Sequence, residues 1–128
     1  MCVKLSVLAM ALIIVGTING AKADPIADAQ LLAAENIRKQ LPMRIDEQTT
    51  LVAVTAAGRM AKYLYRLDLE KGILPPIWYK RQKELLTNNV CRHPKMSNAM
   101  KRGASYSYMY LDSHGKLVTD IVVRFSDC

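Results

Sequence analysis

SYSYMYL, at residues 105–111, is the stretch of this sequence that decides the fold, because tyrosines occupy every second position. Alternation with a period of two is typical of a β-strand whose two faces meet different surroundings. A cluster of turn-forming residues, Asp112–Gly115, comes next, and a run rich in β-branched residues follows over Lys116–Phe125. Two such runs joined by a short turn predict a β-hairpin.

A second hairpin is predicted closer to the N-terminus. The short run Thr49–Ala56 is rich in β-branched residues. In Met60–Leu69, apolar and aromatic residues alternate with mostly charged ones. Ala57–Arg59 joins them as a tight turn, in which Gly58 is able to adopt a positive φ. The two runs are therefore expected to pair as neighbouring strands.

Three segments show helical signals. Asp24-Pro25 is an N-cap followed by proline at the first helical position, and a helical period of apolar residues continues to Leu41. Pro75-Pro76 begins a second helix that runs to Val90, and a short third helix ends at Gly103. Together these segments predict an α+β domain with the order α-β-β-α-α-β-β. We expect one antiparallel sheet of about four strands, made of the two hairpins, with helices on one face.

Residues 1–23 have the layout of a secretory signal peptide. Lys4 precedes the apolar run Leu5–Val15, and Ala21-Lys22-Ala23 matches a cleavage site with two small residues. The alternative is a transmembrane anchor, which would need roughly 20 apolar residues, whereas this run has about 11. Cleavage is therefore expected after Ala23.

Such cleavage would leave residues 24–128 as a single domain, which we expect in the periplasm. A bacterial lipoprotein carries a cysteine directly after the apolar run of its signal. Here Cys2 lies ahead of that run. No lipid anchor is therefore expected.

Two cysteines remain in the mature chain, Cys91 and Cys128. An even number of cysteines in an oxidising compartment indicates a single structural bridge. Closing the intervening loop would stabilise the fold by about 4 kcal/mol on the chain-entropy model. A redox-active pair and metal ligation are the alternatives, although neither is supported by the C-x-x-C spacing usual for such chemistry.

The chain is basic, with a formal net charge of +7. A basic excess favours nucleic acid, anionic lipid or an acidic protein surface as partner. The basic residues are spread out, however, and only Lys80-Arg81 with Lys83 and Lys101-Arg102 are clustered, as solvated helix faces commonly are. Three roles are open to the tyrosine stripe of residues 106–110, namely stacking on bases, a protein-binding face and the core. Core packing is favoured among these, and no nucleic-acid partner is predicted.

Catalytic constellations are not evident. A nucleophilic pair of Cys91 and His93 would lose its thiolate in a disulfide, and it has no orienting group. A metal site of His93, His114 and Asp112 is less favoured than ordinary turn chemistry. Phosphate-binding loops and hydrolase elbows are also missing from the sequence. We therefore predict no enzyme, cofactor or metal site, unless His93, His114 and Asp120 converge in a cleft.

From about Leu41 onward, the order of features resembles the AspS-type pilotins of the type II secretion system. The matching pieces, in chain order, are Leu41-Pro42, Thr50-Leu51-Val52, Gly58, Cys91, Gly103 with Tyr106, Gly115-Lys116-Leu117-Val118, Asp120 and Cys128. The resemblance implies a sheet flanked by helices, a disulfide between Cys91 and Cys128, and binding of a helical segment from the C-terminus of a secretin. Pilotins are lipoproteins, so a relative without a lipid could bind such a segment but could not deliver its client by the lipoprotein route.

We therefore predict a non-enzymatic periplasmic module that binds an envelope protein, with a helical segment of a secretin as the expected partner. The alternative is a soluble periplasmic accessory, exclusion or inhibitor protein of another envelope system, such as conjugation. Adaptable apolar side chains are expected to form the binding groove. The candidates are Met43, Met60, Met96, Met100, Met109 and the tyrosines.

Overall fold

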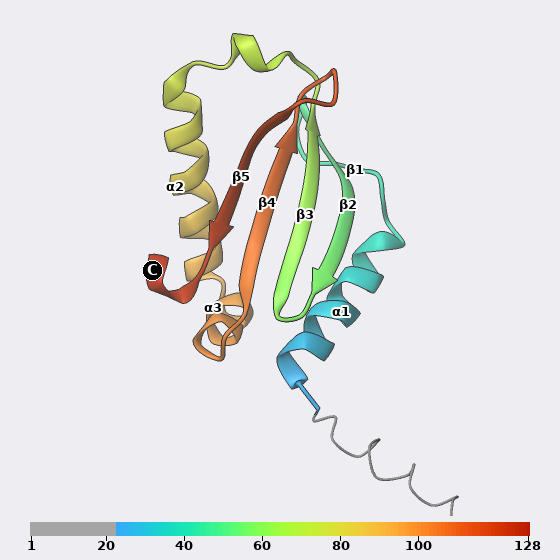
Figure 1. Ribbon diagram of the computed structural model, residues 1–128, viewed down its shortest axis with the longest axis vertical. Helices are drawn as coiled ribbons and strands as arrows, with labels where there is room; N and C mark the ends of the chain where they lie inside the picture. Colours follow the sequence, from blue (N-terminus) through green and yellow to red (C-terminus); the bar gives the residue numbers. More distant parts are fainter. Residues whose placement is uncertain (1–22) are drawn as a thin grey trace, which may run out of the picture.

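The computed structural model describes residues 23–128, and these form three α-helices and five strands (Figure 1). The predicted signal peptide lies outside the described residues, except for Ala23. The elements in chain order are α1 (Pro25–Arg38), β1 (Met43–Arg44), β2 (Thr49–Ala57), β3 (Met60–Leu67), α2 (Pro76–Arg92), α3 (Pro94–Lys101), β4 (Ser105–Leu111) and β5 (Leu117–Val123). Two short 3-10 helices, η2 (Lys71–Ile73) and η3 (Phe125–Asp127), lie in the connections. The predicted α+β class and the predicted order of helices and hairpins are confirmed.

The sheet has five strands in the order β1-β2-β3-β4-β5 and is mixed, so the prediction of about four strands, all antiparallel, was wrong in both respects. β1 is only two residues long, which is too short to show a period. The pair β3 and β4 is parallel, whereas the other neighbours are antiparallel. The reason lies in the connection through α2 and α3, which returns the chain to the end of the sheet where β3 begins (Figure 1).

Tyrosines form the centre of the sheet's covered face. Tyr63 lies beside Tyr108 and Tyr65 beside Tyr110 across the parallel pair, with ring centroids 5.1 and 4.9 Å apart. Tyr106, Tyr108 and Tyr110 are all buried. The tyrosine stripe is therefore part of the core, which confirms core packing as its role.

All three α-helices cover this same face. Ile26 of α1, Val90 of α2 and Met100 of α3 belong to one cluster with the buried tyrosines. α1 begins as predicted, because the Asp24 carboxylate accepts a hydrogen bond of 3.1 Å from the Ala27 N–H and proline follows the cap. The prediction of helices on one face is confirmed.

A disulfide joins Cys91, near the end of α2, to Cys128, with the two Cα atoms 5.7 Å apart. It ties the tail after β5 to the helix layer. Among residues 23–128, none of the helices has the length and apolar character required to cross a membrane.

Candidate peptide-binding groove

A groove of about 330 Å³ lies between α2 and the loop of residues 45–48, over one end of the covered sheet face. Nine of its fourteen lining residues are aliphatic or aromatic, and the others supply three amides, one hydroxyl and one carboxylate, so that polar and apolar atoms share its exposed surface about equally. The residues that line it are Ile45, Asp46, Gln48, Thr49, Tyr65, Leu67, Leu69, Leu74, Trp78, Gln82, Leu85, Leu86, Asn89 and Tyr110.

The floor of the groove is aromatic. Tyr65 and Tyr110 stack there, and the ring of Trp78 meets that of Tyr110 edge-on, with centroids 5.6 Å apart. The amide of Gln82 donates a hydrogen bond of 2.7 Å to the Tyr110 hydroxyl. Burial raises the phenol pKa of both tyrosines above the ordinary value of 10.0. Phenols are uncharged at neutral pH even at this ordinary value, and burial keeps these two uncharged further into the alkaline range.

Both walls expose aliphatic side chains. Leu85 on α2 is 52% exposed, and Ile45 on the loop is 49% exposed. Isolated exposed aliphatic residues are common, but these two border the same concave surface. An apolar ligand placed in the groove would cover both of them.

Asp112 secures the segment that leads into α2. Its carboxylate accepts hydrogen bonds from the backbone N–H groups of Lys71, His114 and Lys116, at 3.1, 2.8 and 2.8 Å. The residue is only 2% exposed. Burial alone would raise the pKa of Asp112, but the three N–H donors outweigh it and lower the pKa below 3.8. The β4–β5 turn is thereby joined to η2, from which the chain enters α2.

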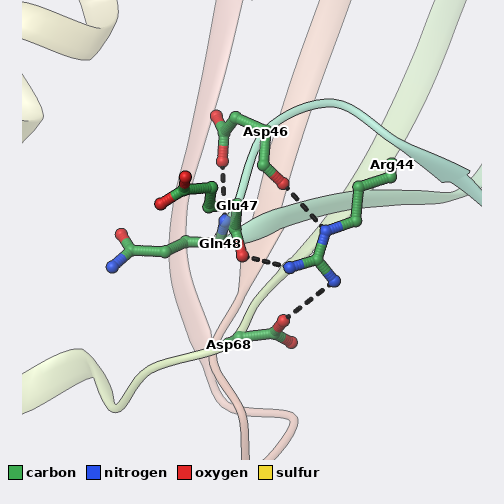
Figure 2. A network of polar contacts seen from close by, with 5 residues as sticks. All are labelled: Arg44, Asp46, Glu47, Gln48 and Asp68. Carbon is green, nitrogen blue, oxygen red and sulfur yellow. Dashed lines mark hydrogen bonds and ion pairs between the residues drawn. The ribbon is translucent and has the colours of Figure 1, made fainter.

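Arg44 secures the loop wall (Figure 2). Its Nε donates to the Asp46 carbonyl at 3.0 Å, and its Nη2 donates to the Glu47 carbonyl. Its Nη1 lies 3.4 Å from Oδ2 of Asp68, just beyond the end of β3. The Gln48 N–H completes the loop by donating to the Asp46 carboxylate at 2.9 Å. The loop contacts of this network lie within three positions of the chain, whereas Asp68 is 24 positions from Arg44 and is brought to it only by the fold.

The methionines proposed for the groove lie elsewhere. Met100 is 3% exposed in the core, and Met43 and Met96 pack against the two core clusters. Met109 lines a hollow with Lys62 and Ser107. No methionine lines this groove, so the methionines have no part in a binding site placed here. The aromatic and leucine residues that do line the groove were predicted from the sequence only as members of strands and of a helix, and not as a binding surface.

The two histidines lie at opposite ends of the sheet. Nδ1 of His93 accepts a hydrogen bond from the Met96 N–H at the start of α3, and His114 lies in the β4–β5 turn. Nε2 of His114 is 3.1 Å from a Glu70 carboxylate oxygen, and this contact raises the His114 pKa. Asp120 accepts a hydrogen bond from the Ser107 hydroxyl at 2.6 Å. Within residues 23–128, no three His, Cys, Asp or Glu side chains are placed to hold a metal ion.

Comparison of the sequence with models of protein families gave no match, and comparison with curated proteins gave none. Comparison of the structure found solved proteins with the same fold. The pilotin EpsS of the Vibrio vulnificus type 2 secretion system has a TM-score of 0.68 and 13% identity, over 81% of this chain and 92% of that one. The type II secretion system pilotin AspS of Vibrio cholerae has a TM-score of 0.64 and 15% identity, over 81% and 93%. A protein of Pseudomonas aeruginosa described as secreted has a TM-score of 0.66 and 15% identity, over 84% and 99%. The chain therefore has the fold of these type II secretion pilotins, as the resemblance in its sequence implies.

Proposed function

We propose that this chain is a non-enzymatic protein of the bacterial periplasm that binds a helical segment of a secretin in the groove between α2 and residues 45–48. The observation that carries the proposal is the groove itself, with its uncharged aromatic floor and an exposed aliphatic residue on each wall. An amphipathic helix that lays its apolar face into an apolar groove is a common mode of peptide recognition. The fold shared with two pilotins supports a secretin as the partner.

The length of the groove suits a short helix. Its α2 wall extends from Trp78 to Asn89, which corresponds to roughly 16 Å, or about three turns. A ligand helix of that length would present apolar side chains at positions i, i+3 or i+4, and i+7 to the floor. The amides of Gln82 and Asn89 can meet polar groups along its edge.

Export to the periplasm is part of the proposal. The disulfide is typical of an oxidising compartment. The proposed mature N-terminus, Asp24, has a structural role, because its carboxylate caps α1 and lies 2.9 Å from Nε of Arg59. Residues 24–128 would thus form the working domain, after removal of residues 1–23.

Peptide titration of the protein purified from the periplasm tests the proposal. The probe is a labelled synthetic peptide with the C-terminal sequence of the secretin from the same bacterium, and its fluorescence anisotropy reports binding. Trp78 is the only tryptophan in the chain, so its intrinsic emission reports whether the peptide enters the groove.

Leu85→Asp should weaken binding more than about tenfold, because it places a charge where an apolar contact is needed. Leu32→Asp is the matched control, because Leu32 is an equally apolar and exposed residue on α1 that does not line the groove. The proposal would be overturned if the peptide failed to bind the wild type, or if the two variants bound it equally well.

A further inference from the structure

The two walls of the groove differ in how they are held. The α2 wall is a continuous helix of 17 residues, whereas the loop wall follows a strand of two residues. Few backbone hydrogen bonds hold the loop. Ile45 N–H donates to the Thr49 carbonyl at 2.9 Å, and the two bonds between Asp46 and Thr49 are 3.4 Å long. The Asp68 N–H donates to the Gln48 carbonyl at 2.8 Å, whereas the carbonyl of Glu47 accepts no backbone bond from residues 23–128 and is left to the Arg44 side chain. A segment with so few bonds opens readily unless side chains hold it.

Arg44 supplies that restraint without lining the groove. Two consecutive loop carbonyls, those of Asp46 and Glu47, converge on its guanidinium (Figure 2). A planar guanidinium presents several donors in a fixed fork, whereas the ammonium of a lysine is a single point of charge. The ion pair with Asp68 contributes little by itself, since both side chains are about half exposed.

We infer that Arg44 is a positioning residue for peptide binding, because it fixes the loop so that Ile45 stands on the wall that faces α2. This inference rests on the proposed function. A wall that is fixed before the ligand arrives does not have to be ordered by it, and the affinity is correspondingly higher. Arg44 acts through the loop and does not contact the peptide.

Three variants test this role: Arg44→Ala, Arg44→Lys and, as the matched control, Arg66→Ala. Arg66 is an exposed arginine on β3, at the end of the sheet where Arg44 lies. It follows Tyr65, which faces the groove, so the side chain of Arg66 points to the open face of the sheet, away from the groove. Both Arg44 variants should bind the secretin peptide roughly three- to tenfold more weakly, and Arg66→Ala should bind it like the wild type.

Hydrogen exchange of the free proteins provides a measurement that does not depend on the peptide. Exchange at residues 45–49 should be faster in both Arg44 variants, while exchange in α2 and β4 stays as in the wild type. Uniformly faster exchange across the sheet would mean that Arg44 only stabilises the fold, and would overturn the inference. Wild-type affinity in Arg44→Lys would overturn it as well, because charge would then suffice.

The outcomes also separate the inference from the proposed function. If the wild type does not bind the peptide, the proposed function fails, and the exchange data alone decide whether Arg44 holds the loop. If the wild type binds and Arg44→Ala binds equally well, only the positioning role fails.

Discussion

The side-chain amide of Gln82 on α2 donates a hydrogen bond of 2.7 Å to the hydroxyl of Tyr110 on β4. It links the wall of the groove to its floor across 28 positions of sequence. Tyr110 is almost fully buried, so its hydroxyl would otherwise lack a partner away from water.

A double-mutant cycle measures this link. Gln82→Ala and Tyr110→Phe should each destabilise the protein by about 1 kcal/mol, and the double variant should lose less than the sum of the two. The measurement is urea unfolding followed by circular dichroism. Strictly additive losses would show that the two groups do not interact in solution.

Asp112→Asn should lower the melting temperature at neutral pH, because an amide cannot accept three N–H groups as a carboxylate does. The folded-state pKa of Asp112 is lowered, so its contribution to stability is present above 3.8 and is lost as the pH falls through the lower folded value. The gap in melting temperature between wild type and variant should therefore close in acid. Glu35→Gln, an exposed change on α1, provides the control. A gap that is independent of pH would refute the ionic role of Asp112.

The tyrosines of the sheet should resist ionisation. Burial raises the phenol pKa of Tyr63, Tyr65, Tyr106, Tyr108 and Tyr110 above 10.0. Since these phenols ionise more easily in the unfolded chain, stability is complete below that pH and falls as the pH rises above it. The phenolate absorbance of these five of the six tyrosines should therefore rise together with the loss of circular dichroism, and not before it. Early ionisation of all the tyrosines in folded protein would contradict this arrangement.

Cys91→Ser and Cys128→Ser should each lower the free energy of unfolding by up to about 4 kcal/mol, and the double variant should lose no more than either one. Each substitution removes the same bond. Denaturant titration measures the losses. A thiol assay of the denatured, unreduced wild type is the control, and finding two free thiols would rule out the bridge in solution.

N-terminal sequencing and intact mass test the export hypothesis. The protein from the periplasm should begin at Asp24 and carry no acyl group. Retention of residues 1–23 would contradict a cleaved signal, and an acyl group would contradict the expectation of no lipid anchor.

Much of the fold could be predicted because its signals are local. Asp24-Pro25 caps α1, Gly58 has a φ of 59° in the first hairpin turn, and the alternating tyrosines lie on the covered face. Each of these features depends on neighbours within a few positions of the chain, where period and turn chemistry act. The two-residue strand β1 falls below the length at which a period can be recognised.

The parallel pairing of β3 with β4 could not be read from the chain, since periodicity reports which face a residue takes and not which strands become neighbours. The groove depends on this long-range pairing. The parallel register sets Tyr65 beside Tyr110, and the fold brings α2 to face loop 45–48 across them. Arg44 and Asp68 likewise meet only because β1 and β3 flank β2. Local patterns along the chain were thus sufficient for the elements and the core face, whereas the binding surface arises from contacts between segments far apart in sequence, which only the packed structure brings together.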